Sequence, residues 1–110
     1  MEVTVKSLNQ VDLITVDGRV DGSTAPELGE VLNTRIERGT HNLVVDLGGV
    51  DYMSSAGLRE LVAALKRVRS AGGDLRLSNP SERVSKVLEL AGLNSIFQVY
   101  ADQVEAVGSF

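Results

Sequence analysis

The sequence has 110 residues, the size of one domain, with 43% hydrophobic and 24% charged side chains. Its formal net charge of −4 argues against nucleic acid as the main ligand, because binding to phosphate backbones normally needs an excess of basic residues. Cysteine is absent, which excludes disulfides, zinc–thiolate sites and thiol catalysis and suits a cytoplasmic protein.

The first forty residues predict two strands followed by a helix. Val3 and Val5 alternate with polar residues, and a second apolar run over 11–16 ends at the Asp-Gly dipeptide of residues 17–18. A helix is predicted within residues 21–39, since this stretch opens with capping residues and carries an apolar stripe at helical spacing.

From residue 41 onward, strands alternate with helices. The predicted elements are a nearly continuous apolar strand at 43–47, a helix from about Ser55 to Ser70, a strand in 75–80, a helix from 81 to the stop at Gly92, a strand at 96–100 and a closing helix at 102–107. The order ββαβαβαβα predicts a single α/β domain over residues 1–110. We expect a mixed, mostly parallel sheet of about five strands with about four helices, its first two strands antiparallel.

Two loops stand where ligands of open α/β sheets gather, at the ends of strands and the beginnings of helices. They are "GRVDGSTAPEL" and "DLGGVDYMSSAGLREL". In the second loop one of Ser54 and Ser55 is expected to cap the helix, and the other is surplus to that need. The surplus serine either makes a turn hydrogen bond or is a phosphoacceptor at a helix N-terminus. The residues alone leave both interpretations open.

The other residues that could form a catalytic or metal site do not indicate one. Gly48 and Gly49 belong to no phosphate-binding motif and are interpreted as a tight turn, while Gly57 would let the first helical turn pack closely. His41, the only histidine, precedes the strand that the serines follow, so we expect no Ser-His-Asp triad. No spacing suits metal ligands, and we predict neither a metal nor a cofactor.

Together these segments resemble a known family. The run "LVVDLGGVDYMSSAGLRELVAALKRVRSAGGDLRLSNPSERVSKVLELAGL", with "GRVDGSTAPEL" before it, is similar to a STAS domain, the fold of bacterial anti-sigma factor antagonists. The resemblance implies a non-enzymatic partner switch. The unphosphorylated antagonist would bind an anti-sigma factor, a serine kinase of the GHKL ATPase type, and release a sigma factor. Phosphorylation by that kinase would end the complex, and a phosphatase would restore it.

The resemblance also assigns roles to residues. Aligned on Met53 and Gly57, the family's phosphoacceptor falls on Ser55, and Ser54 competes with it because it stands where the family often has aspartate. The family's loop aspartate falls on Asp21. The partner-binding surface that the resemblance implies comprises Asp21, Ser23, Met53, Ser54, Ser55, Ala56, Gly57 and Arg59.

Other functions stay open at this point. STAS domains also occur in stress-signalling and lipid-transport complexes, and a small nucleotide-binding domain or a phosphoaspartate receiver would use the same sheet edge. The sequence shows no signal peptide and no apolar run long enough to span a membrane, so we expect no membrane insertion. Exposed strand edges predict a monomer or a weak dimer.

Overall fold

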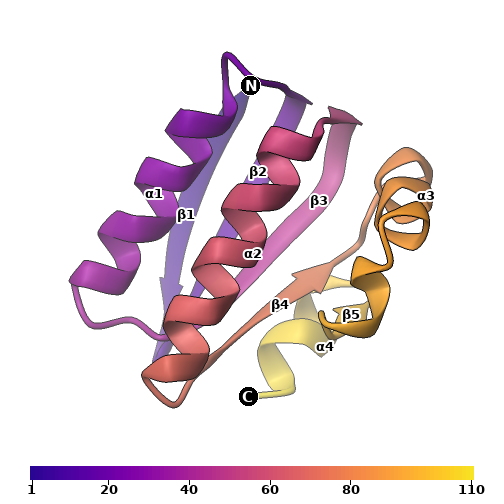
Figure 1. The fold of residues 1–110 in the computed structure, drawn as a ribbon. Coiled ribbons are helices and arrows are strands. Elements are labelled where there is room, and N and C mark those ends of the chain that lie inside the picture. The colour runs from indigo at the N-terminus through magenta and orange to yellow at the C-terminus, as the bar shows by residue number, and fades with distance from the viewer.

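The computed structural model describes residues 1–110, which form one five-stranded sheet flanked by helices (Figure 1). The elements are β1 (Glu2–Leu8), β2 (Val11–Val20), α1 (Ala25–Glu37), β3 (Asn42–Met53), α2 (Ser55–Ser70), β4 (Asp74–Ser78), α3 (Glu82–Leu90), the short 3₁₀ helix η1 (Leu93–Ser95), β5 (Val99–Tyr100) and α4 (Gln103–Gly108). The predicted α/β class, strand number, helix number and element order are confirmed.

The strands lie in the sheet in their order along the chain, β1-β2-β3-β4-β5. The β1–β2 pair is antiparallel, as expected, and the other three pairs are parallel. Helices α1 and α2 cover one face side by side, while α4 lies against the other face (Figure 1). Because the strand order never reverses, this sheet has no switch-point crevice at its carboxyl edge.

The core is almost entirely aliphatic. A cluster of 22 buried side chains fills the space between the sheet and helices α1, α2 and α3, and the predicted stripe of α2 belongs to it. A separate cluster of four buried residues fixes α4 to the opposite face. Full burial of one leucine or valine contributes about 1.5–3 kcal/mol, so these two clusters hold the sheet rigid. None of the helices has both the length and the hydropathy needed to cross a bilayer.

Strands β2 and β3 are longer than predicted. Gly18, at φ +95°, shifts the register of β2 without ending it, and β2 stays paired with β3 as far as Val20. The glycines interpreted as a turn, Gly48 and Gly49, lie inside β3 instead. A Cβ on Gly48 would meet the side chain of Asn79, with Cγ 2.9 Å away, and a Cβ on Gly49 would meet that of Asp17. These glycines therefore make room for neighbouring side chains, and the turn interpretation is wrong.

The last strand is shorter than predicted, since β5 includes only Val99 and Tyr100. Phe97 is 4% exposed, and its backbone N–H donates to the carbonyl of Leu93 at 3.2 Å in a helical pattern. The chain around Ile96 and Phe97 therefore coils inward to bury the phenylalanine ring. Phe97 is thus a core anchor in an irregular turn, whereas its neighbour Ile96 stays exposed.

A buried carboxylate fixes the point where β4 leaves β3. Asp46 is 4% exposed, and Ser78, opposite it on β4, is fully buried. The Ser78 hydroxyl donates to Asp46 Oδ2 at 2.9 Å, and the Gly48 N–H donates to Oδ1 at 3.0 Å. After Asp46, β3 is no longer paired with β4. Its last residues reach the C-terminal end of the sheet, where α2 begins.

Replacing Ser78 by alanine removes the only side-chain donor to this buried carboxylate. We expect S78A to lower the free energy of unfolding by about 1–3 kcal/mol, measured by urea denaturation. Ser70→Ala is the control, because the Ser70 hydroxyl is exposed and bonds only to the carbonyl of Lys66. The control should change stability by less than about 0.5 kcal/mol. Equal effects of the two substitutions would contradict the role given to Asp46.

Candidate functional site

The parallel pairing of β2 with β3 brings the two predicted loops together. Val20 and Met53, the last residues of these strands, are register partners. The next backbone N–H, that of Ser54, donates to the carbonyl of Val20 at 2.8 Å. Asp21 therefore follows Val20 at the same sheet edge where Ser54 follows Met53, as the sequence predicted.

The structure gives the two serines different positions. Ser54 is the N-cap of α2, with an extended backbone (φ −89°, ψ 169°) and a hydroxyl that accepts the Gly57 N–H at 3.4 Å. Ser55 is the first residue of the helix and is exposed, and its hydroxyl makes no hydrogen bond within the chain. The hydroxyl surplus to capping is therefore that of Ser55.

The first turn of α2 lies directly on the sheet. A Cβ on Gly57 would lie 2.7 Å from Val20 Cγ1 and would also collide with the sulfur of Met53, which confirms the predicted close packing. Met53 is 4% exposed, and Gly57 is buried as well. The family resemblance places both residues on the partner-binding surface. The structure corrects this: they support that surface from below, because the helix could not approach the strands otherwise.

The loop after β2 is organised by Asp21. Its Oδ1 accepts the hydroxyl of Ser23 at 2.7 Å and the Ser23 N–H at 2.9 Å, and its Oδ2 accepts Nε of Arg19 at 2.9 Å. The Ser23 hydroxyl and the Arg19 guanidinium hold the pKa of Asp21 well below its usual range. Asp21 thus presents a permanent negative charge in a fixed loop beside the start of α2.

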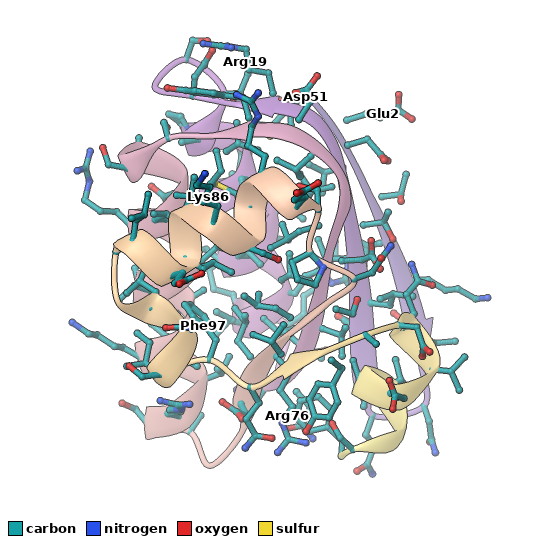
Figure 2. All side chains as sticks on the ribbon, turned by 90° about the vertical axis from the view of Figure 1, so that its right-hand side faces the viewer. Glu2, Arg19, Asp51, Arg76, Lys86 and Phe97 are labelled. Carbon is teal, nitrogen blue, oxygen red and sulfur yellow. The ribbon has the colours of Figure 1, made fainter.

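Two residues near the site escaped the sequence analysis, Arg19 and Tyr52. They are partners across β2 and β3, and the Arg19 guanidinium lies 3.9 Å from the centre of the Tyr52 ring. This contact holds Arg19, which is labelled at the top of Figure 2, in place for its ion pair with Asp21. Because Arg19 is only two residues from Asp21, the sequence could have suggested their ion pair. The contact of Arg19 with Tyr52 depends on strand register, so no sequence pattern indicated it.

The predicted surface residues that are accessible form a small polar patch. Ser23, Ser55 and Arg59 are exposed, and Ala56 is half-buried. Arg59 follows Ser55 by four residues, so both lie on one side of α2. His41 lies at the opposite end of β3 from these serines, which leaves a Ser-His-Asp triad without its base. No three His, Cys, Asp or Glu side chains are grouped to hold a metal ion.

A separate open groove lies against helix α3. It has a volume of about 800 Å³ and runs between α3 and the free part of β3, from Gly48 to Asp51. Lys86, on α3, lines it and faces the viewer in Figure 2. Neither Ser54 nor Ser55 borders the groove, so the exposed Ser55 lies on the surface outside it.

Comparison with known proteins finds relatives over most of the chain. The family model described as STAS domain matches residues 2–106. The anti-sigma-B factor antagonist of Staphylococcus epidermidis is 33% identical over 101 residues, covering 90% of this chain and 94% of the relative. The anti-sigma-B factor antagonist of Staphylococcus aureus is 35% identical over 86 residues, covering 78% of this chain and 80% of the relative.

Solved structures share the fold. An anti-sigma factor antagonist from Mycobacterium paratuberculosis superposes with a TM-score of 0.89 at 24% identity, covering 98% of this chain and 92% of the other. The antagonist SpoIIAA in its unphosphorylated form gives 0.85 at 20% identity, with 96% and 93% covered. The phosphorylated form of SpoIIAA, from Bacillus, gives 0.79 at 19% identity, with 98% of each chain covered.

Substitution of Gly57 by alanine tests the close approach of α2. At a helical position that is free of contacts, this change would stabilise the protein, because alanine has the higher helix propensity. Here the added methyl group meets the branched side chain of Val20, and we expect a loss of about 1–3 kcal/mol in urea denaturation. Gly22→Ala, with nothing within 4 Å of the new Cβ, is the control and should be nearly neutral. A stabilised G57A would contradict this packing.

The pH dependence of stability tests the Asp21 loop. The pKa of Asp21 is lower in the folded than in the unfolded chain, so its carboxylate stabilises the fold at neutral pH, and this contribution is lost as pH falls. We expect Asp21→Asn to lower the thermal midpoint at pH 7. The gap from wild type should shrink below about pH 4, where the unfolded chain binds a proton. A gap that stays constant down to pH 2 would exclude this linkage.

Proposed function

This chain belongs to the STAS domain family, and we propose that it acts as an anti-sigma factor antagonist that is switched off by phosphorylation of Ser55. In the unphosphorylated state it binds an anti-sigma factor serine kinase of the GHKL ATPase type in the cytoplasm, and the sigma factor is released. A phosphatase reverses the modification. The names of the two staphylococcal relatives support the role of antagonist. The existence of SpoIIAA in two phosphorylation states supports the switch.

One observation carries the assignment to Ser55: its hydroxyl is exposed and free at the start of α2, whereas Ser54 is occupied as the cap. A kinase must reach the acceptor hydroxyl and orient it toward ATP. Ser54 is half-buried and its hydroxyl accepts the Gly57 N–H, so modification of this hydroxyl would require the cap to open. Ser55 meets the requirement without any change in the helix.

The same position explains how a phosphate would act on the complex. Phosphorylation adds a charge of about −1.5 to −2 at neutral pH, which the N-terminus of α2 accommodates through its free N–H groups and dipole. The fold therefore tolerates the modification. Arg59, one turn further along α2, is available to the phosphate as an ion-pair partner.

The effect on the partner is electrostatic. Asp21 is ionised at all physiological pH values, because Ser23 and Arg19 stabilise its carboxylate. A phosphate on Ser55 would place a second, larger negative charge on the same patch. A partner surface that matches the unmodified patch then meets strong repulsion and an unmatched charge, which typically costs several kcal/mol at an interface.

Three serine variants test this proposal with the cognate anti-sigma factor kinase. Ser55→Ala should bind the kinase like wild type and stay unmodified in ATP, as measured by intact mass. Ser55→Asp should weaken binding at least about tenfold in calorimetry, because it introduces a charge where the phosphate would stand. Ser54→Ala is the matched control. It should lose about 1 kcal/mol of stability with the cap but still gain one phosphate.

The outcomes separate the two serines cleanly. A phosphate on S55A together with an unmodified S54A would transfer the role of acceptor to Ser54. Unaltered kinase binding by S55D would disprove the electrostatic switch even if Ser55 is modified.

A further inference from the structure

The two edges of the sheet differ in how they are protected. At one edge, β5 has only two residues, too short to offer much to another strand. At the other, β1 has seven residues, of which only Val3 and Leu8 are partly covered. Its outer side has no neighbouring strand, and it lies at the outside of the sheet behind α1 in Figure 1. A strand of this length with free backbone groups is suited to pair with another chain.

The charges on β1 are not matched within the chain. Glu2 lies opposite Asp17 of β2, a like-charge neighbour, and Lys6 lies opposite the apolar Leu13. Neither Glu2 nor Lys6 takes part in any of the four ion pairs of the structure. Like charges directly opposite each other in a sheet are destabilising, so Glu2 would gain from a cation on its free side.

We propose that β1 pairs antiparallel with β1 of a second copy of this chain, about a two-fold axis at Thr4. In this register Glu2 of each copy lies opposite Lys6 of the other, and Val3 lies opposite Val5. The two sheets then join into one continuous sheet across the dimer. The interface is isologous, since each copy contributes the same strand.

The charge pattern selects this register among the alternatives. The register of a symmetric antiparallel strand pair is defined by the residue that lies on the two-fold axis. An axis at Glu2 would oppose the two Glu2 side chains, and an axis at Lys6 would oppose the two lysines. Only the axis at Thr4 puts both charges of each strand opposite a charge of opposite sign. The two symmetric cross-strand ion pairs therefore favour this register over the others.

Apolar contacts lie along the same seam. Val5 is 38% exposed, which is high for valine in a strand. It borders an open groove of about 420 Å³ with Val31 of α1. Val3 of the second copy, opposite Val5, closes one side of that groove and removes apolar surface from water. A seam of one strand is small beside standard interfaces, so the dimer is weak and forms at high micromolar to millimolar concentrations.

Charge-swapped variants test the pairing. Sedimentation of the wild type should show a mass rising from 11.7 kDa toward twice that value as concentration increases. Glu2→Lys and Lys6→Glu should each weaken the dimer about tenfold or more, since each converts both ion pairs to repulsions. An equimolar mixture of the two variants should form dimers again, because the strands are then complementary. Lys66→Glu, on the exposed side of α2, is the control and should behave like wild type.

Cysteine scanning tests the register independently, in a chain that has no cysteine of its own. Thr4→Cys would place two Cα atoms about 4.5–5.5 Å apart across the axis, within reach of a disulfide. Lys6→Cys would place its two cysteines about 13 Å apart along the strands, beyond that reach. We expect cross-linked dimer from T4C under mild oxidation and none from K6C. A wild type that stays at 11.7 kDa up to millimolar concentration, or a mixture of E2K and K6E that stays monomeric, would overturn the proposal.

Discussion

The parallel pairing of β2 with β3, continued to Val20 and Met53, is the constraint on which the site depends. It aligns the ends of two strands that are 33 residues apart in sequence. The loop of Asp21 and the start of α2 are then adjacent without any direct bond between their side chains. The hydrogen bond from the Ser54 N–H to the Val20 carbonyl is the last rung of this pairing, and it places the helix cap.

Strands β2 and β3 extend further than the sequence predicted, and glycines at points of close contact make this possible. Gly48 and Gly49 leave room for the side chains of Asn79 and Asp17, and Gly57 lets α2 lie on the strand ends. The buried bond between Asp46 and Ser78 marks where β4 departs and the rest of β3 becomes free of its neighbour. These glycines therefore allow the close packing that places Ser54 and Ser55 at the C-terminal end of β3.

The proposed site lies on an exposed surface at the C-terminal ends of β2 and β3. A sheet with its strands in sequential order has no switch-point crevice, and its open groove of about 800 Å³ lies instead between α3 and the last part of β3. In the patch proposed for partner binding, the Asp21 charge is fixed by hydrogen bonds and the Ser55 hydroxyl is left free. Such a patch can be recognised by a partner and altered by one added charge, while the core beneath it stays unchanged.

The sequence by itself determined the order of elements, the α/β class and the existence of a surplus serine, because apolar periodicity and helix capping are local properties of the chain. Local patterns gave wrong strand bounds where contacts between distant segments decide them: they ended β2 at residues 17–18 and extended β5 over Phe97. The family resemblance placed Met53 on the surface, where the structure buries it. Only the tertiary structure assigned the cap to Ser54 and paired Arg19 with Tyr52. Strand register and side-chain burial depend on contacts between residues far apart in sequence, which no local pattern specifies.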